Sequence, residues 1–449
     1  MPIASTPASE AYAKAAKNKL RRFPSPEKDG DRLYPLASPS VNPGFQFEKS
    51  DTFFAIGSCF ARNVEAALSN ANLRVLSREF DLGKIGESLG EAFNFFNKYS
   101  VHSIYNELLW ALERDTFPGE EILYPLRQGK KYCDLQLGSA KLEFSPKEIL
   151  EFRHKFLDSM AQVAHTDVII LTLGYVETWY DKELDIYLNI APPAALCKAQ
   201  PDRFEFRVLS YEEVMQGMND IYALLKKHRT KPLKMLVTVS PVPLLSTFRD
   251  MDVLVANTYS KSVQRAVLES FVADKPDVDY FPSYEFVILS NPTIAWSRGD
   301  YRHVSPDIVA RIMSNVLTSY LPGQAASDQT TQEILTPEAL LPTARLYFKL
   351  EQDEKLVTLL DENPDIVANS VDLLLLKAAG QRRLGHLEDC FECQKAAIDL
   401  APKRPAPLER QIKLCRPLRR NEVAKELLQL HKERFPGRGG FRNDLAWLK

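Results

Sequence analysis

The sequence predicts an α/β fold, in which a three-layer α/β/α domain with a parallel sheet is followed by an all-α domain of helical repeats. Up to residue 321, short apolar runs that end in glycine or proline alternate with amphipathic stretches at helical spacing. This alternation is typical of a parallel sheet that helices cover on both faces. No strand pattern appears after residue 336. A chain of 449 residues is longer than a single hydrophobic core usually accommodates, so two domains are expected.

Residues 1–45 are expected to form an irregular N-terminal arm, because they are rich in proline and lack a regular hydrophobic period. Within this arm, residues 14–22 have the composition of a short basic amphipathic helix. The arm contains no long apolar run, so we expect no secretory signal.

The composition indicates a soluble globular protein: 45% of the residues are hydrophobic and 26% are charged. No window approaches the roughly 18 uninterrupted apolar residues of a membrane span. Six cysteines in a chain of this length do not make a disulfide framework, which fits a reducing, cytoplasmic location. The formal net charge of −2 provides no bulk attraction for nucleic acid.

Between residues 46 and 321, five apolar stretches are predicted to be strands. They lie at residues 52–57, 73–76, 167–174, 234–240 and 279–288. Pro282 interrupts the last stretch, so an edge strand or two short pieces are expected there. Helical spacing of apolar residues predicts helices at residues 59–71, 101–112, 146–163, 253–272 and 305–321.

A polar linker at residues 322–336 separates this domain from the predicted helical repeats at 337–449. Residues 374–402 and 410–436 have the pattern of two helical pairs that each end in proline, and the two prolines are 34 residues apart. This period is typical of tetratricopeptide repeats, which bind protein partners; an unrelated helical bundle is the alternative. Residues 403–449 hold 13 Lys and Arg against 5 Asp and Glu, which fits either a solvated helical surface or an anionic partner.

Ser58 follows the first predicted strand and directly precedes a predicted helix. In a parallel sheet, the carboxyl ends of the strands are where ligands bind, and Gly174 and Ser240 end two further strands there. Free N–H groups at the start of a helix can stabilise the oxyanion of a tetrahedral intermediate, so Ser58 is a candidate nucleophile. An ordinary helix N-cap is the alternative role for a serine in this position.

The second candidate group is Asp300 with His303, just before the helix that begins near Ser305. An aspartate three residues before a histidine can accept the imidazole Nδ1 hydrogen, which leaves Nε2 as a proton acceptor for a serine nucleophile. Taken alone, His303 fits a surface or structural role better than a catalytic one.

Cysteines offer two further interpretations. Cys59 lies at a helix N-terminus, where thiol pKa values fall, so it is an alternative nucleophile or a packing residue. Cys390 and Cys393 form a C-x-x-C pair inside a predicted helix. Because no second Cys or His pair has zinc spacing, helix packing is favoured over a metal site. No phosphate-binding or dinucleotide glycine motif is present, and no cofactor is expected.

Five matches in a fixed order carry a resemblance to a known family. They are GSCFA at 57–61, LTLG at 171–174, VSPVP at 239–243, SKS at 260–262 with Arg265 after it, and YFPSYE at 280–285. The first is the name-giving motif of the GSCFA family, which is similar to the SGNH (GDSL-like) hydrolases. The resemblance covers roughly residues 46–321. It implies that Ser58 is the nucleophile and that Asp300 and His303 are the acid–base pair.

The sequence departs from the SGNH pattern at the oxyanion hole. SGNH enzymes follow the third strand with Gly-x-Asn-Asp, whereas residues 174–177 are Gly-Tyr-Val-Glu. The valine cannot donate a side-chain hydrogen bond, so another donor is expected. The candidates for the oxyanion or substrate site are Cys59 through its amide, Gly174, Glu177, Asn97 and Asn189. Asn97 and Asn189 also fit turn formation. SGNH enzymes have a second glycine in the oxyanion hole, and Gly83 and Gly86 are the candidates for it here.

The resemblance implies a serine enzyme that transfers a small acyl group, above all acetyl, from an ester on a carbohydrate or small molecule. Water as the acceptor makes it an esterase, and a hydroxyl acceptor makes it an O-acyltransferase of glycan precursors with the same residues. A catalytically dead domain that serves as an interaction scaffold is the alternative from another class. Val176 favours the scaffold, whereas the joint presence of Ser58, Asp300 and His303 opposes it.

Overall fold

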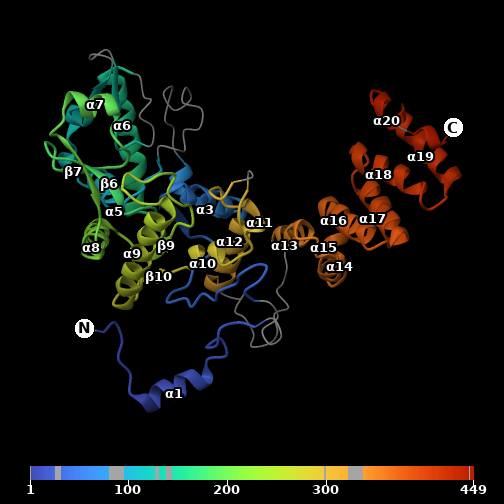
Figure 1. Ribbon diagram of the computed structural model, residues 1–449, viewed down its shortest axis with the longest axis horizontal. Coiled ribbons are helices and arrows are strands. Elements are labelled where there is room, and N and C mark those ends of the chain that lie inside the picture. The colour runs from blue at the N-terminus through green and yellow to red at the C-terminus, as the bar shows by residue number, and fades with distance from the viewer. Residues whose placement is uncertain are drawn as a thin grey trace. The chain divides into compact units, whose positions relative to one another are not determined.

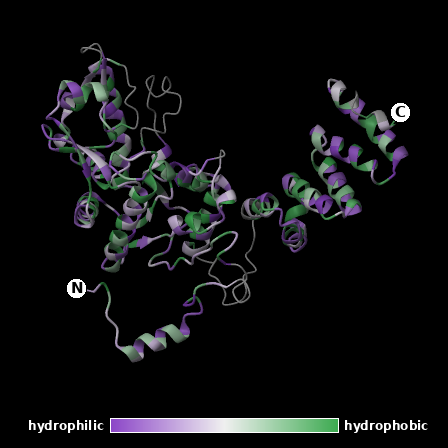
Figure 2. Ribbon diagram, in the orientation of Figure 1, coloured by the Kyte–Doolittle hydropathy of each residue, from purple (hydrophilic) through white to green (hydrophobic). Residues whose placement is uncertain are grey.

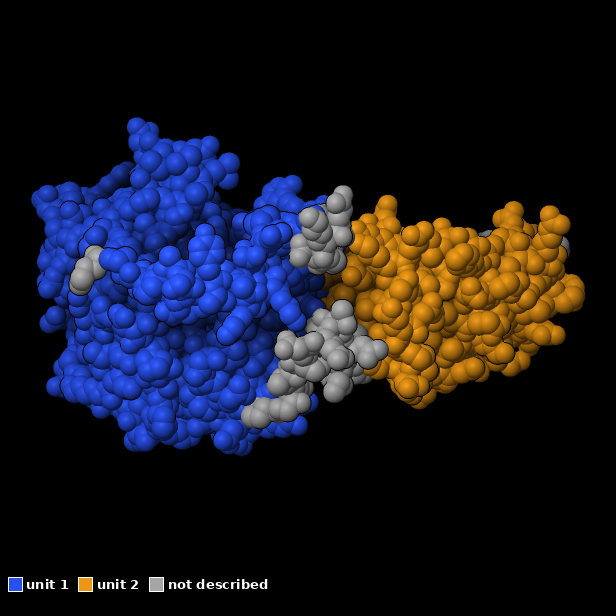
Figure 3. Space-filling model, turned by 90° about the horizontal axis from the view of Figure 1, so that it is seen from below, with its two compact units in different colours: residues 1–326 blue, residues 327–449 orange. Residues whose placement is uncertain are grey.

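The structure is a computed structural model that describes residues 2–25, 32–79, 96–126, 131–137, 144–297, 300–321, 337–443 and 445–448. Contacts within the chain divide it into two compact units, residues 1–326 and 327–449 (Figure 3). The first unit contains a parallel sheet with helices, and the described part of the second contains helices alone (Figure 1). The predicted α/β fold followed by an all-α region is therefore confirmed.

The central sheet of the first unit has five parallel strands in the order β10-β9-β5-β1-β2. The strands are β1 (Thr52–Gly57), β2 (Arg74–Val75), β5 (Val168–Leu173), β9 (Lys234–Val239) and β10 (Val278–Tyr280). β5 lies in the middle and is buried along its whole length, which explains why its sequence is a continuous apolar run rather than an alternating one. The carboxyl ends of β1, β5 and β9 consequently lie side by side.

Helices cover both faces of this sheet (Figure 1). One face packs against α5 (Val101–Leu112), α6 (Pro146–Ala161), α8 (Tyr211–His228) and α9 (Val253–Ala273) in one hydrophobic cluster. The other face packs against α3 (Cys59–Asn70), α10 (Ser283–Ile288) and α12 (Pro306–Tyr320). On that face, the Phe53 ring meets Phe47 at 5.4 Å edge-on, and Phe47 stacks on Tyr320 at 4.6 Å. Alternate residues of β1 thus face opposite layers, as the two-residue period of a strand requires.

Two small antiparallel sheets were not predicted from the sequence. One is the hairpin β3 (Leu123–Leu126) and β4 (Lys131–Asp134), and the other has the order β7-β6-β8. The latter contains β6 (Glu177–Asp181), β7 (Ile186–Leu188) and β8 (Phe204–Val208), with the short helix α7 (Ala194–Ala199) between β7 and β8. Their strands are short and partly exposed, so they lack the apolar runs that identify buried strands.

One predicted strand is corrected. Residues 279–288 contain the edge strand β10 and then helix α10, with Pro282 between them. Proline has no N–H to donate to a ladder, and its fixed φ suits a position just before a helix. The helix α11 (Pro292–Ala295) follows, and short 3-10 turns occur at Leu76–Arg78, Arg114–Thr116, Gly119–Ile122 and Gln162–Ala164.

The N-terminal arm has two parts. Its helix is α1 (Ala8–Lys17), which contains no buried residue and begins earlier than the helix predicted over residues 14–22. Alanine-rich sequence favours a helix there, since alanine has the best helix propensity. Further along, the arm packs on the first unit: Gly44 donates to Asp279 at 2.7 Å, and the Phe47 amide donates to the Tyr320 carbonyl at 2.8 Å.

The second unit is a series of short helices. They are α13 (Pro337–Lys349), α14 (Asp353–Asp361), α15 (Pro364–Ala368), α16 (Val371–Arg383), α17 (Leu387–Leu400), α18 (Pro405–Cys415), α19 (Asn421–Arg434) and α20 (Gly439–Asn443). Figure 2 shows hydrophobic and hydrophilic residues alternating along these helices, as in amphipathic helices that pack on one side. Gly385 adopts φ 83° in the tight turn between α16 and α17. In the described part of the chain, no helix has the length and apolar character needed to cross a membrane.

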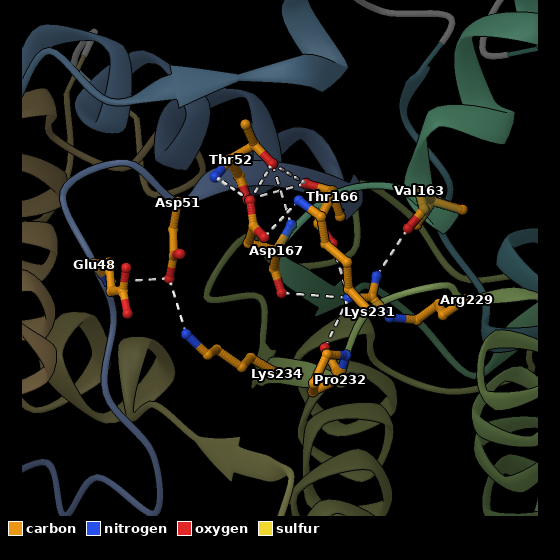
Figure 4. Close-up of polar contacts among 10 residues, drawn as sticks. All are labelled: Glu48, Asp51, Thr52, Val163, Thr166, Asp167, Arg229, Lys231, Pro232 and Lys234. Carbon is orange, nitrogen blue, oxygen red and sulfur yellow. Dashed lines mark hydrogen bonds and ion pairs between the residues drawn. The ribbon is translucent and has the colours of Figure 1, made fainter.

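A polar network joins the amino ends of β1, β5 and β9 (Figure 4). The Asp167 carboxylate accepts from the Thr52 amide at 2.9 Å and from the Thr52 hydroxyl at 2.7 Å, and it pairs with Lys231 at 2.7 Å. Arg229 donates to the carbonyls of Val163 and Thr166 at 2.9 and 2.7 Å. Charges at this edge of the sheet are therefore paired within the protein.

We expect Asp167→Asn to destabilise the first unit in a pH-dependent way. Partial burial raises the pKa of Asp167, but hydrogen bonds from Lys231 and Thr52 outweigh it and lower the pKa from 3.8 to about 2. A lowered pKa stabilises the folded state above the unfolded-state value, and this stabilisation is lost as the pH falls toward 2. The contribution is about 2 kcal/mol at neutral pH. Urea unfolding at pH 7 and pH 3 measures it, and the gap between wild type and variant should narrow at pH 3.

The matched control is Asp158→Asn, because Asp158 pairs with Arg114 at 2.7 Å but its side chain is 71% exposed. A surface pair of this kind contributes only about 0–1 kcal/mol. Equal destabilisation by the two substitutions would contradict the proposed role of the network.

Candidate functional site

Ser58 lies at the junction of β1 and α3, at the carboxyl edge of the sheet. It is the N-cap residue of α3, and its hydroxyl accepts from the Phe60 amide at 3.2 Å. The hydroxyl also lies 3.3 Å from the Thr172 hydroxyl on β5, and the Ser58 amide donates to the Thr172 carbonyl at 3.1 Å. Ser58 is only 1% exposed. The serine thus caps the helix and also stands where an α/β sheet presents its ligand site.

Gly57 makes this junction possible. Its φ of +136° is a conformation that side chains disfavour, and a Cβ here would lie 2.1 Å from the Thr172 carbonyl oxygen. Any other residue would push β1 away from β5 at the point where Ser58 is placed. The glycine of the motif therefore fixes the position of the serine beside Thr172.

A segment at residues 97–99 lies across the carboxyl ends of β1 and β5. Asn97 pairs with Gly57 in a parallel bridge, and the Lys98 amide donates to the Gly57 carbonyl at 2.7 Å. The Tyr99 carbonyl accepts from the Tyr175 amide at 2.7 Å. A Cβ on Gly174 would lie 2.6 Å from that carbonyl, so glycine is needed there for close backbone contact. Asn97 is consequently a neighbour of the Ser58 junction.

Asn189 has a different place from Asn97. Its side-chain amide donates to the Asn97 carbonyl at 2.9 Å, and its side-chain oxygen accepts from the Tyr99 amide at 2.9 Å. Both ends of the side chain are therefore used to hold the 97–99 segment. The side chain of Asn97 is 3% exposed and hydrogen-bonds that of Tyr99.

A buried ionic network that includes Lys98 holds the 97–99 segment in place. Lys98 lies 3.3 Å from Glu107, and Arg153 pairs with Glu107 at 2.7 Å and with Asp134 at 3.1 Å. All four side chains are fully buried. Burial lowers the pKa of Lys98 to about 8, although Glu107 opposes this shift. Removing one member would leave a buried charge without its partner, which is strongly destabilising.

The Asp300–His303 contact is present just before α12. The His303 Nδ1 atom lies 2.5 Å from an Asp300 carboxylate oxygen, and the other oxygen accepts from the amides of Arg302 and His303 at 2.9 and 2.8 Å. Backbone hydrogen bonds first, and then the imidazole, lower the pKa of Asp300 to about 2. The carboxylate thus stays ionised, as an orienting group for an imidazole requires.

The structure brings the 300–303 segment to the same edge as Ser58 without a direct hydrogen bond between them. Burial raises the pKa of Tyr175, and Arg302, next to His303, opposes that shift. Tyr175 follows Gly174 just after the end of β5. Among the described residues, the partners of the Ser58 hydroxyl are Phe60 and Thr172, and none is His303. Ser58 adjoins Cys59 and His303 adjoins Arg302, whose positive charge lowers the pKa of both Cys59 and Tyr175 against the larger effect of burial.

Of the two interpretations of Cys59, the structure favours a packing residue over a nucleophile. Burial raises the pKa of this thiol, although the positive charges of Lys261 and Arg302 act in the opposite direction. Desolvation disfavours the thiolate more than the helix N-terminus and the two cations favour it. Cys59 is therefore a neutral thiol beside Ser58.

Val176 and Glu177 form hydrogen bonds with residues of other segments. Val176 is fully buried, and its amide donates to the Ser260 hydroxyl at 3.0 Å. Glu177 begins β6 and accepts from the Thr247 hydroxyl at 2.8 and 2.9 Å. Position 176 is thus a core position in this structure. Gly83 and Gly86 lie outside the described residues.

Three residues to which the sequence analysis gave no role also lie at this edge, namely Lys261, Tyr99 and Tyr175. The Lys261 ammonium on α9 donates to the Gly174 carbonyl at 2.8 Å and lies 5.4 Å from the centre of the Tyr175 ring. Tyr99 stacks on Tyr175 at 5.5 Å. Lys261 falls among the buried positions of α9 at helical spacing. A lysine in an apolar stripe is the signal that could have identified it.

No metal site is evident in the described part of the chain, where no group of three or more His, Cys, Asp or Glu side chains could hold an ion. Cys390 is buried in α17, where it packs against Phe391 and Leu414, and Cys393 is half-buried beside this cluster. Their C-x-x-C spacing therefore serves helix packing in this structure.

Comparison with known proteins gives one match. The model of the GSCFA family matches residues 52–315, which is more than half of the chain and includes every residue at the carboxyl edge described above. No curated protein matches this chain.

We expect Gly57→Ala to destabilise the protein by more than about 3 kcal/mol, because the new Cβ would collide with backbone rather than with a flexible side chain. The control is Gly119→Ala, whose φ is +65° but whose Cβ would meet no atom within 4 Å. That change should cost about 1 kcal/mol from backbone strain alone. Urea unfolding of both variants tests this, and similar losses would show that contact with Thr172 is unimportant.

Proposed function

The chain belongs to the GSCFA family, and we propose that it is an SGNH-type serine enzyme that transfers a small acyl group through an acyl-enzyme. The observation that carries this proposal is the place of Ser58 at the β1–α3 junction together with the Asp300–His303 contact, because Arg302, next to His303, acts on the pKa values of Cys59 and Tyr175. The Ser58 junction supplies the first N–H groups of α3, and Asp300 accepts from the His303 Nδ1 atom. These are the elements of serine acyl transfer.

In the proposed reaction, the Ser58 hydroxyl attacks the carbonyl carbon of an ester while His303 Nε2 takes the hydroxyl proton. The tetrahedral intermediate then expels the alcohol, which receives that proton from His303. Water or an acceptor hydroxyl attacks the acyl-enzyme in the second half, and His303 takes and returns its proton in the same way. Asp300 holds the imidazole in the tautomer that both halves need.

The oxyanion is held by the amide of Cys59 at the start of α3 together with a second donor. Asn97 is the candidate for that donor, because it pairs with Gly57 one residue before the nucleophile. Asn189 instead positions the 97–99 segment through its two hydrogen bonds. This division assigns different roles to two residues that look alike in the sequence.

The substrate proposal follows from the resemblance to SGNH enzymes: an acetyl or similar small ester on a carbohydrate, with hydrolysis as the first choice. O-acyl transfer to glycan precursors in the cytoplasm uses the same residues. The second unit is proposed to be a tetratricopeptide-like array that binds a protein partner. Its support is the pairing of α16 with α17 and of α18 with α19, with Pro402 and Pro436 just after the second helix of each pair.

A fluorophosphonate probe tests the nucleophile in the full-length protein. We expect a mass increase of one probe on Ser58, and its absence in Ser58→Ala. Cys59→Ala is the matched control at the neighbouring position and should label normally, because burial keeps the Cys59 thiol protonated. Labelling of Cys59 in place of Ser58, or no labelling of a folded protein, would reject the serine mechanism and leave the interaction scaffold as the better interpretation.

The two asparagines should separate kinetically. Asn97→Ala is expected to reduce kcat for a p-nitrophenyl ester by about 10²–10³ with little change in KM, as for loss of an oxyanion donor. Asn189→Ala should lower thermal stability as well as activity, because the Asn97 carbonyl and Tyr99 amide lose buried partners. Full activity in a stable Asn97→Ala variant would show that the second donor lies elsewhere.

A further inference from the structure

Two cationic side chains flank Tyr175 at the carboxyl edge of the sheet. Lys261 approaches the ring from α9 with its ammonium 5.4 Å from the ring centre. Arg302 comes from the segment before α12, and it opposes the effect of burial, which raises the pKa of the Tyr175 phenol. The cations reach the same aromatic side chain from elements that are far apart in the sequence.

Neither cation has a carboxylate partner among the described residues. Lys261 is 1% exposed, and its polar partner there is the Gly174 carbonyl. The Nε atom of Arg302 is buried without a hydrogen-bond partner in that set. The nearby Asp300 carboxylate is already engaged by His303 and by two backbone amides. Buried charges are normally paired, so these two basic side chains lack the carboxylate partner that a buried cation normally has.

The other groups around Tyr175 do not supply negative charge. Burial raises the pKa of the Cys59 thiol and of the Tyr99 and Tyr175 phenols, so all three are neutral at physiological pH. The start of α3 adds the partial positive charge of a helix N-terminus. Burial lowers the pKa of Lys261 to about 7, and a bound anion would favour its charged form again.

We infer that the substrate of this site carries an anionic group, a carboxylate or a phosphate, which Arg302 and Lys261 bind beside the reacting ester. The inference rests on the proposed serine acyl transfer, and it narrows the substrate class from esters in general to anionic esters. A guanidinium fork and an ammonium are the two side chains that proteins use most for carboxylate and phosphate. Because both cations act on Tyr175, the anion would bind next to this residue, which follows Gly174 in the sequence. Ser58 lies at the same edge of the sheet.

The alternative is that Lys261 has only a structural role through the Gly174 carbonyl. The two roles predict opposite effects on stability. Replacing a buried cation that lacks a carboxylate by methionine removes a desolvation penalty, so Lys261→Met should keep or raise the midpoint of thermal unfolding. A lysine retained for structure would instead leave a less stable protein when it is removed.

The kinetic test compares two esters with the same leaving group, neutral p-nitrophenyl acetate and anionic mono-p-nitrophenyl succinate. The wild type should favour the anionic ester. Arg302→Gln and Lys261→Met should each lower kcat/KM for the anionic ester by about 10- to 100-fold, as for a lost hydrogen bond to a charged group. The neutral ester should change less than about 3-fold. Lys275→Met, two residues beyond the end of α9, removes the same charge outside the site and is the control for long-range electrostatics.

A binding measurement keeps this inference separate from the proposed chemistry. Calorimetry with succinate and with inorganic phosphate, on wild type, Arg302→Gln and Ser58→Ala, shows whether an anion binds and which of the two it is. Binding that survives Ser58→Ala and is lost in Arg302→Gln supports the anion site even if no ester is turned over. Equal loss of both esters in Arg302→Gln and Lys261→Met, or no binding of either anion to the wild type, overturns it.

Discussion

The buried ionic network of Lys98, Glu107, Arg153 and Asp134 is the constraint on which the candidate site depends. Lys98 lies between Asn97 and Tyr99, and its ammonium is held at 3.3 Å from Glu107 and 2.6 Å from the Gln136 carbonyl. Four fully buried charges stabilise a fold only in one geometry, since a displaced member would be left without a partner. The backbone of the 97–99 segment is therefore fixed against the ends of β1 and β5. Ser58, Gly174 and Tyr175 take their positions from that contact.

The two edges of the sheet use charge in opposite ways. At the amino edge, Asp167 and Asp51 pair with Lys231 and Lys234, and Arg229 is satisfied by carbonyls. At the carboxyl edge, Lys261 and Arg302 have no carboxylate partner among the described residues. Paired charges stabilise the folded state, whereas unpaired buried charge costs free energy unless a ligand compensates it. The paired charges that stabilise the fold thus lie at the amino ends of the strands, and the candidate ligand site lies at their carboxyl ends.

The sequence was most informative where one residue type has one physical explanation. The glycine-terminated apolar runs identified β1 and β5, and the i, i+3 spacing of Asp300 and His303 anticipated their contact. It was least informative where the position of a side chain or segment depends on residues far away in the sequence. The 97–99 segment, the β6–β8 sheet and the approach of Lys261 to Gly174 join residues tens of positions apart, and no local period encodes them. Cys59 shows the same limit, because its pKa depends on burial by the whole fold rather than on its helix terminus.

The unpaired cations also bear on the choice between an enzyme and a scaffold. A domain kept only to present its surface gains nothing from a buried ammonium such as Lys261, which lowers stability without making a surface contact. The same holds for Gly57, whose strained conformation serves to place Ser58 against Thr172. Strain and unpaired charge are features that proteins concentrate at functional sites. Here the strained Gly57 directly precedes Ser58, and the charges of Lys261 and Arg302 act on the adjacent Cys59. This concentration favours a reaction or a bound anion at the carboxyl edge over a purely structural role.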